Sequence, residues 1–153
     1  MSIELAVREA AREDIPVILA MLADDDLGST REDASEAGLG IYEAAFDRIA
    51  ASGNVSLKLV ELDGAPVGTF LFIVIPGLAL KGMVRVEIEQ VRIASSHRGE
   101  GLGRKMIGWA IDEARRIGAG MVQLTMNKTR TDSKRFYESL GFTASHEGFK
   151  LYL

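Results

Sequence analysis

The chain has 153 residues, no cysteine and a formal net charge of −4. A chain of this length buries roughly 68–70% of the surface that it exposes when unfolded, so it needs no disulfide or metal to fold. The lack of cysteine excludes a disulfide framework, a thiolate zinc site and a cysteine nucleophile, and it fits a reducing, cytoplasmic compartment. With two histidines, His97 and His146, a zinc site is not expected either.

The charge and hydropathy patterns argue against nucleic acid and membranes as partners. The net negative charge disfavours a polyanion, and the longest apolar run, residues 67–80, is too short and too interrupted to span a bilayer. The first fourteen residues have no apolar core, so we expect no signal peptide. Residues 24–36 hold six acids and one arginine, whereas residues 98–135 hold nine basic and four acidic residues. This asymmetry permits an anionic ligand over the C-terminal half and a cationic one near the acidic stretch.

The first half of the chain predicts two helices and a hairpin. Residues 3–8 alternate as a short strand, and residues 12–23 show near-helical spacing. A polar loop over 27–40 precedes a second helix, whose expected apolar face holds Ile41, Ala44, Ala45, Ile49 and Ala50. Two β-rich runs, 55–61 and 66–75, are joined through Asp63-Gly64, and this dipeptide predicts a β-hairpin.

The second half predicts a strand, a helix and a repeat of that order. Residues 84–93 alternate, which places Glu87, Glu89, Val91 and Ile93 on one face and Val86, Ile88, Gln90 and Arg92 on the other. A helix follows over 102–117, then a strand over 121–126 and a helix over 131–140 that Gly141 ends. Residues 142–153 are expected to form one or two closing strands.

This order predicts a single domain over residues 1–153 of the α/β (mixed α+β) class. The expected core is a central mixed, mostly antiparallel sheet flanked by about four helices, with one parallel pair joined by a crossover helix.

A glycine-rich turn, Arg98-Gly99-Glu100-Gly101-Leu102-Gly103, joins the third long strand to the helix at 102. The start of a helix leaves about four backbone N–H groups without intrahelical acceptors and carries partial positive charge. Glycines allow a bulky anion to approach the backbone, so the turn predicts a phosphate-binding cradle. Neither the P-loop spacing nor the G-x-G-x-x-G dinucleotide spacing is met.

At this turn the sequence resembles the GNAT superfamily of acetyl-CoA-dependent N-acetyltransferases. The family pattern R/Q-x-x-G-x-G/A is met by Arg98, Gly101 and Gly103. The resemblance implies a GNAT-like fold and acetyl-CoA as cosubstrate. It further implies that the cofactor's pyrophosphate binds to the amides of Arg98, Gly99, Glu100, Gly101, Leu102, Gly103 and Arg104, and that its pantetheine arm pairs with Val91, Arg92 and Ile93.

A second segment, residues 124–142, resembles the other conserved GNAT region: a strand, a polar turn, a helix with Phe136-Tyr137, then Gly-Phe. The resemblance implies that Tyr137 is the general acid for the departing thiolate. Many relatives have an asparagine three residues before the small residue of this helix, Ser133, where this chain has Arg130. Asn127 is then the nearer candidate for a hydrogen bond to cofactor or substrate, and Asn127, Arg130 and Ser133 are all expected near the cofactor.

Acetyl transfer to an amine needs a base, a polarised carbonyl and a proton for the leaving thiolate. Glu87 and Glu89 are the candidate bases, and we leave open which of them, or a water, acts. A backbone N–H in a widened gap between the strands of Ile93 and Met121 is expected to polarise the carbonyl.

Three hypotheses follow for the function. The leading one is an amine N-acetyltransferase that acts on a small-molecule or peptide acceptor in a ternary complex. The alternatives are a non-catalytic acyl-CoA-binding regulatory module of the same fold and a hydrolase or other phosphate-ligand enzyme. The acidic stretch at 24–36 suggests a cationic acceptor. A homodimer is common in the family, and the apolar strand at 69–75 is a candidate pairing face.

Overall fold

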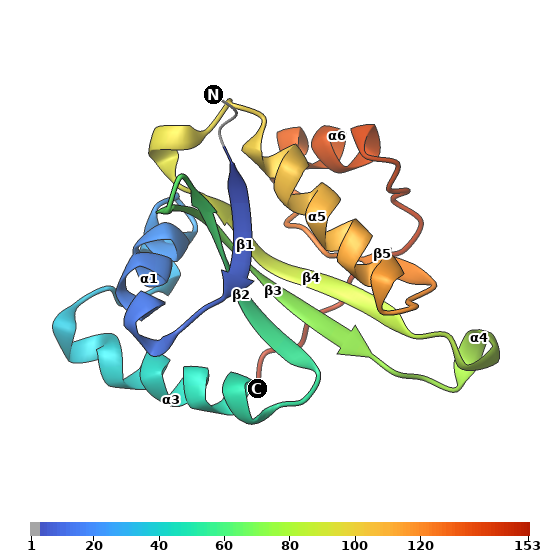
Figure 1. Ribbon diagram of the computed structural model, residues 1–153, viewed down its shortest axis with the longest axis horizontal. Helices are drawn as coiled ribbons and strands as arrows, with labels where there is room; N and C mark the ends of the chain where they lie inside the picture. The colour runs from blue at the N-terminus through green and yellow to red at the C-terminus, as the bar shows by residue number, and fades with distance from the viewer. Residues whose placement is uncertain (1–3) are drawn as a thin grey trace. The chain divides into compact units, whose positions relative to one another are not determined.

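The computed structural model describes residues 4–153 and confirms the mixed α/β class with a mostly antiparallel sheet (Figure 1). The strands are β1 (Leu5–Glu9), β2 (Val55–Leu62), β3 (Ala65–Ile75), β4 (Arg85–Ile93) and β5 (Met121–Gln123). The α-helices are α1 (Ile15–Ala23), α2 (Gly28–Arg31), α3 (Leu39–Ala51), α4 (Ala79–Gly82), α5 (Leu102–Arg116) and α6 (Thr131–Ser139). Three 3-10 helices add Arg12–Asp14, Glu36–Gly38 and Ser95–His97.

The described chain divides into two compact units. The first unit runs to Gln123 and contains the whole sheet together with α1 to α5, whereas the second unit, Leu124–Leu153, contains α6. The catalytic and cofactor-binding residues predicted from the sequence therefore come from both units. That residues 1–153 form one domain stays a prediction.

The sheet has the strand order β1-β2-β3-β4-β5. β1 to β4 pair antiparallel, and β5 pairs parallel with β4 after the crossover through α5. The predicted hairpin between β2 and β3 is confirmed, with Asp63 at φ 49° and Gly64 at φ 81°. Both central residues are thus left-handed, as a two-residue turn that follows the strand twist requires.

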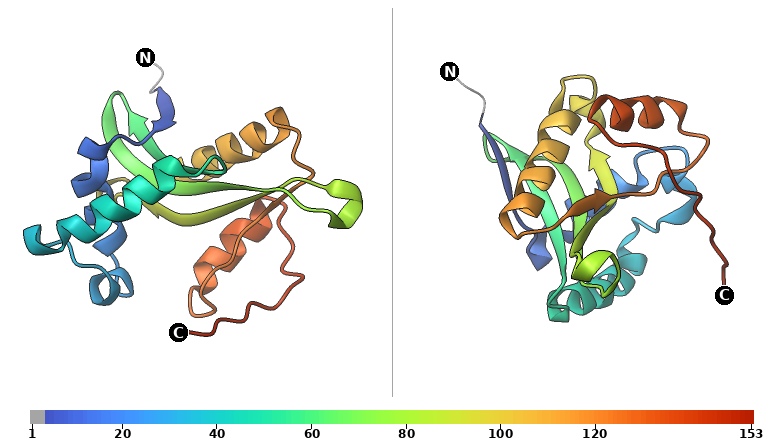
Figure 2. Two further views of the ribbon diagram at one scale, coloured as in Figure 1. Left: turned by 90° about the horizontal axis from the view of Figure 1, so that it is seen from below. Right: turned by 90° about the vertical axis from the view of Figure 1, so that its right-hand side faces the viewer.

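Helices cover both faces of this sheet in the first unit. Trp109 of α5 packs edge-on against Phe70 and Phe72, with ring centroids 6.0 and 6.5 Å apart. Ile18 and Met21 of α1 pack with Leu59 of β2 on the other face, and Figure 2 lets the reader follow the two layers. The buried core residues of α5 repeat every three to four positions, which explains why the predicted helix forms: Leu102, Met106, Ile107, Ala110 and Ala114.

Several predicted elements differ from those observed. In the second helix, α3, the predicted Ala45 and Ile49 are partly buried, whereas Ile41 is 70% exposed and Ala44 and Ala50 are exposed as well. Phe46, which was not predicted, joins the partly buried face. β5 ends at Gln123 rather than at Met126, and residues 142–153 contain no assigned strand. The expected loop over 27–40 contains α2, a 3-10 helix and the start of α3. The start of the first predicted strand, residue 3, lies outside the described residues.

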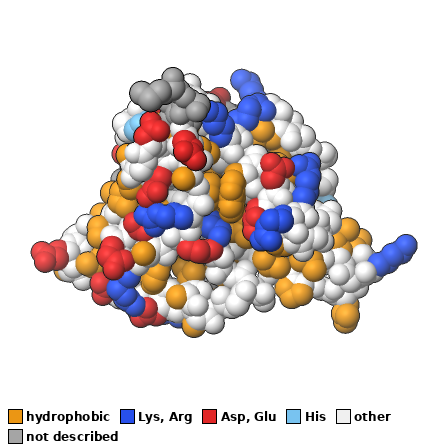
Figure 3. Space-filling model, viewed as in Figure 1, with side chains coloured by type: hydrophobic (Ala, Val, Ile, Leu, Met, Phe, Trp, Pro, Cys, Tyr) orange, Lys and Arg blue, Asp and Glu red, His pale blue; other side chains and the backbone are white. Residues whose placement is uncertain are grey.

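The strand predicted as a homodimer face, residues 69–75, is an inner strand of the sheet, and residues 73–75 at its end are only partly buried. β3 pairs with β2 on one side and β4 on the other, and Thr69, Phe70, Leu71 and Phe72 are all buried. Two highly exposed apolar side chains lie in the connection between β3 and β4, where Leu78 is 97% and Leu80 is 60% exposed. Figure 3 shows apolar side chains in this region, whereas acidic and basic side chains are interspersed over the rest of the same face.

Candidate functional site

The predicted cradle is a strand–turn–helix segment that lies in the first unit of the chain. β4 ends at Ile93, the 3-10 helix Ser95–His97 follows, and α5 begins at Leu102. Gly99 and Gly101 have φ angles of 83° and 76°, in the left-handed region that disfavours side chains. A Cβ built on either glycine meets no atom within 4 Å. The turn is therefore open on the side where a ligand would contact its backbone.

The turn presents main-chain donors beside cationic side chains. At this end of α5 the amide of Lys105 donates to the carbonyl oxygen of Gly101 at 3.4 Å. The amides of residues 102–104 precede this bond and so lie before the first i→i−4 hydrogen bond of the helix. Leu102 and Met106 are buried and anchor the helix end, whereas Arg98 and Lys105 are exposed. Leu102 can contribute to a ligand site through its backbone alone. This set of amides and cations fits an anion with several negative oxygens.

A β-bulge in β4 changes which side chains share a face. Gln90 has φ 55°, and the register with β3 shifts so that Gln90 and Val91 together oppose Phe70. Glu89 pairs with Leu71, and Arg92 with Thr69. Because Leu71 and Thr69 point to the same face, Arg92 joins Glu89 there, and the predicted simple alternation is wrong beyond Gln90.

The other face after the bulge belongs to α5. Ile93 pairs with Gly68, and a Cβ built on Gly68 would lie 3.1 Å from the Cδ1 of Ile93 and 3.3 Å from the Sδ of Met106. Ile93 thus packs toward α5, opposite to the glutamates with which it was grouped. Glu87, Glu89 and Arg92 form the polar row of β4 on the α1 face.

One edge of β4 extends beyond its parallel partner. β5 pairs from Arg85↔Met121 to Glu87↔Gln123 and then ends, so Ile88–Ile93 continue past it. In this stretch the carbonyl of Val91 accepts a hydrogen bond from Arg92 Nη1 at 2.9 Å, and that of Ile93 accepts one from Arg98 Nε at 3.3 Å. Guanidinium groups thus contact the segment that was predicted to pair with an extended ligand.

The two candidate bases differ in their surroundings. Gln123 Nε2 donates to Glu87 Oε2 at 2.7 Å, and Arg85 Nη1 donates to Gln123 Oε1 at 3.1 Å. Glu87 is therefore held at the β4–β5 junction by Gln123, which Arg85 holds in turn. Glu89 lies partly buried, two residues closer to the bulge and to the cradle. Gln123 was not predicted from the sequence, because a lone glutamine at a strand end carries no recognisable signal.

The remaining predicted residues lie in the second unit. Asn127 Oδ1 accepts hydrogen bonds from the amide and the hydroxyl of Thr129, at 3.0 and 2.7 Å. The Arg130 carbonyl accepts the amide of Ser133 at 3.1 Å, which starts α6. Asn127 thus shapes the turn before α6, so a ligand contact from it would have to use its side-chain NH2 group.

Tyr137 occupies the second half of α6 within an aromatic cluster. Its ring packs edge-on against Phe136 and Phe142, with centroids 5.1 and 5.8 Å apart. Its carbonyl accepts the amide of Phe142 at 3.2 Å, and Gly141, at φ 94°, makes the turn between them. The ring position is therefore set by neighbours within the same unit.

Two acidic residues that were noted only as part of a charged stretch contact the candidate site. Asp24, which follows α1, lies near Arg98, with Arg98 Nη2 and Asp24 Oδ2 3.7 Å apart. Asp25 Oδ2 lies 3.6 Å from Arg92 Nε. The signal in the sequence was the density of acids over 24–36, but nothing in it indicated which of them meet the arginines.

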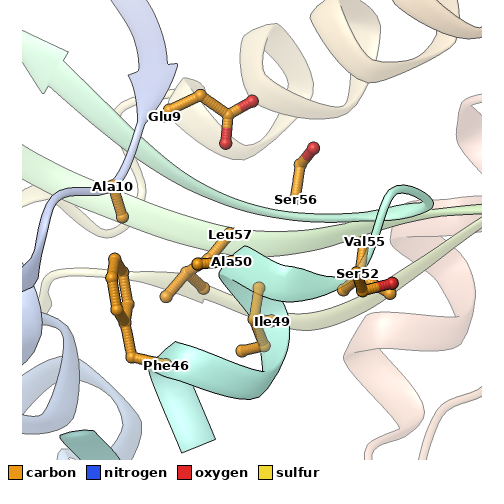
Figure 4. A pocket seen from close by; sticks show the side chains of 9 residues that line it. All are labelled: Glu9, Ala10, Phe46, Ile49, Ala50, Ser52, Val55, Ser56 and Leu57. Carbon is orange, nitrogen blue, oxygen red and sulfur yellow. The ribbon is translucent and has the colours of Figure 1, made fainter.

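A cavity of about 350 Å³ lies elsewhere in the first unit, between α3, the end of β1 and the start of β2 (Figure 4). Its apolar side is formed by Phe46, Ile49 and Leu57, and the polar groups that line it include Glu9 and Ser56. None of its lining residues comes from β4 or α5. The cavity therefore does not belong to the cradle.

Two further findings concern residues 4–153. Among them no three side chains of histidine, cysteine, aspartate or glutamate cluster as a metal site would require. None of their helices has both the length and the apolar character needed to cross a bilayer.

Comparison with known proteins gives a consistent result. The family model described as acetyltransferase (GNAT) family matches residues 19–142, more than half of the chain. The aminoalkylphosphonate N-acetyltransferase of Salmonella typhimurium is 36% identical over 111 residues, which cover 71% of either chain. A transcriptional regulator from Bacillus halodurans C-125 superposes with a TM-score of 0.93 at 39% identity, covering 98% of this chain and 100% of the other. A putative acetyltransferase from Agrobacterium tumefaciens str. C58 superposes with a TM-score of 0.79 at 26% identity, covering 97% of this chain and 99% of the other.

Proposed function

Because the chain belongs to the acetyltransferase (GNAT) family, we propose that it transfers an acetyl group from acetyl-CoA to a primary amine of a small-molecule or peptide acceptor, by direct attack in a ternary complex. The observation that carries the proposal is the turn between β4 and α5. There two left-handed glycines with open space above them meet the positively polarised end of a 15-residue helix.

The acetyl-CoA site is proposed from the groups around this turn. The amides of residues 98–104 would hold the pyrophosphate, with Arg98, Arg104 and Lys105 at its rim. The pantetheine arm would lie along Val91–Ile93, where β4 continues past the end of β5. Side chains of Asn127, Arg130 and Ser133 are proposed as further cofactor contacts. No metal takes part in this proposal.

The chemistry is assigned to residues of both units. Acetyl-CoA supplies a thioester whose acyl carbon is attacked by the amine nitrogen, so that an amide bond forms and the carbon–sulfur bond breaks. Glu89 or Glu87 takes the proton that the amine loses, directly or through water, and Tyr137 gives a proton to the departing thiolate. We favour Glu89 as the base because it lies partly buried beside the bulge at Gln90, two residues closer to the cradle than Glu87.

The relatives support a small acceptor. The Salmonella protein is an aminoalkylphosphonate N-acetyltransferase, and a second Salmonella relative, 40% identical over 55 residues, is an L-methionine sulfoximine/L-methionine sulfone acetyltransferase. Both names describe small amines with a tetrahedral oxygen-bearing centre. We therefore place aminoalkylphosphonates first among the acceptors to be tested.

The alternative function is a regulatory module of the same fold that binds acyl-CoA without turnover. It is favoured by one observation, the superposition on the Bacillus halodurans transcriptional regulator. This alternative predicts acetyl-CoA binding with no amine that accelerates thiol release. A homodimer and a cytoplasmic location stay predictions, which sedimentation and cell fractionation can test.

Thiol release from acetyl-CoA is a clean test, since the chain has no cysteine of its own to react with a thiol reagent. We expect release that depends on an added amine, and a kcat lowered by about 10²- to 10⁴-fold in Tyr137→Phe. At an acetyl-CoA concentration of about 100 times Kd, binding adds roughly 2.7 kcal/mol of stability and should raise Tm by about 5–11 °C. The absence of a Tm shift with acetyl-CoA would overturn the proposal. A shift without amine-dependent release from any amine of a broad panel would favour the regulatory alternative.

A further inference from the structure

Arg98 links three parts of the first unit. Its Nη2 donates to the carbonyl oxygen of Asp24 at 3.1 Å and lies 3.7 Å from the Asp24 carboxylate. Its Nε donates to the carbonyl of Ile93 at 3.3 Å. The first residue of the cradle is thereby tied both to the turn that follows α1 and to the end of β4.

The turn that follows α1 is itself tightly built. Asp25 Oδ1 accepts the amide of Gly28, and the Asp25 carbonyl accepts the amide of Ser29 at 2.8 Å. A Cβ on Gly28 would lie 2.0 Å from the carbonyl oxygen of Leu22, so the turn folds closely onto the end of α1. Asp25 also faces Arg92 across 3.6 Å, with both side chains less than one-fifth exposed.

The two arginine contacts differ in how easily an anion could replace them. The Asp24–Arg98 pair is exposed, at 44% and 47%, and its charged groups are 3.7 Å apart. Such pairs shift an equilibrium by a factor of about five at most, and a phosphate group offers a guanidinium stronger, bidentate hydrogen bonds. The Asp25–Arg92 pair is mostly enclosed and holds the turn independently of Arg98.

We propose that Arg98 exchanges partners on cosubstrate binding: it leaves Asp24 and the Ile93 carbonyl for the pyrophosphate of acetyl-CoA, and so releases the Asp24 end of the turn while Asp25–Arg92 retains the other end. This inference rests on the proposed function, because it takes the cradle to be the pyrophosphate site. The exchange also clears the carbonyl of Ile93, which belongs to the stretch proposed to pair with the pantetheine arm. Asp24 is then a competitor of the cosubstrate for Arg98.

A double-mutant cycle on acetyl-CoA binding tests the exchange. Removing the competing carboxylate in Asp24→Asn should lower the Kd by about 2- to 5-fold at low ionic strength. The neighbouring Asp26→Asn removes the same charge from an exposed side chain, and because Arg98 bonds to Asp24 and Ile93, it should change the Kd by less. In an Arg98→Gln background, Asp24→Asn should have no effect, because its action passes through Arg98.

The outcomes separate this inference from the proposed function. An equal gain in Asp24→Asn and Asp26→Asn, or a gain that persists without Arg98, would show general charge repulsion and overturn the exchange. An unchanged Kd in Asp24→Asn would overturn it too, and in both cases the wild type still binds acetyl-CoA. If the wild type does not bind, both proposals fail. Hydrogen exchange adds a second readout. The amide of Asp24, which donates to the carbonyl of Met21, should exchange faster in the complex, whereas the amides of Gly28 and Ser29, which are bonded to Asp25, should be unaffected. Unchanged or slower exchange at Asp24 would contradict the release of this end of the turn.

Discussion

Replacing Gly101 by alanine separates the structural role of the glycine turn from its role in binding. At φ 76° an L-residue is strained by roughly 1–2 kcal/mol, whereas its Cβ would meet no atom within 4 Å. The cost to folding is therefore the backbone strain alone, with no steric clash. For a chain of this length it should lower Tm by about 2–8 °C.

The loss of binding should be larger than the loss of stability. The new methyl group would lie in the open space over the turn, where the pyrophosphate is proposed to contact the amides. Losing one or two hydrogen bonds to a charged group, each worth about 1.5–3 kcal/mol, should raise the Kd for acetyl-CoA by at least about tenfold.

The chain provides a matched control at the other end of the same helix. Gly118 has φ 81°, and a Cβ there also meets no atom within 4 Å. Gly118→Ala should thus lower Tm by a similar amount and leave acetyl-CoA binding unchanged. Calorimetric titration of both variants checks this. Unchanged affinity in Gly101→Ala would refute the cradle, and equal losses in both variants would show that helix stability alone explains the effect.

Three further predictions concern stability. Gln90→Val should destabilise the protein by about 1–2 kcal/mol because a β-branched residue fits poorly at φ 55°, whereas Gln90→Gly should be nearly neutral. Urea denaturation measures the stability of both variants, and equal effects would contradict the bulge. Hydrogen bonds from Arg8 lower the pKa of Asp14, so its contribution is present above about pH 4 and is lost as pH falls through the lowered pKa. Calorimetry should show Asp14→Asn below wild type in Tm at pH 7 and converging with it as the pH falls through the lowered pKa of Asp14, and a difference that stays constant with pH would be inconsistent with this. Gly28→Ala should cost about 3 kcal/mol or more, since its Cβ would overlap the carbonyl of Leu22, and a Tm within 2 °C of wild type would disprove that close approach.

The elements that were predicted well carry local signals. Asp63-Gly64 specifies its own turn geometry, and the spacing of Leu102, Met106 and Ala110 marks the buried face of α5. Gly99 and Gly101 both have positive φ angles, as the cradle hypothesis requires of glycines in this turn. In each case the residue type determines the conformation with little help from the tertiary context.

The elements that were predicted poorly depend on contacts distant in sequence. Glutamine gives no sign of a bulge, so the faces of β4 beyond Gln90 were assigned by alternation and came out wrong. α3 contains four alanines, so its apolar face is poorly defined by the sequence. In the structure Phe46 is partly buried and Ile41 is exposed. The pairing of Asp24 with Arg98 spans 74 residues, a separation at which no sequence pattern identifies partners.

The central claim is that the turn between β4 and α5 binds the pyrophosphate of acetyl-CoA. Titrating ¹⁵N-labelled protein with acetyl-CoA and following the amide resonances tests it without knowledge of the acceptor. The largest shifts are predicted for Gly99, Gly101 and Gly103, with smaller ones along Val91–Ile93, and almost none at Gly118. Shifts that gather at the cavity around Phe46, with the three glycine resonances unmoved, would contradict the account.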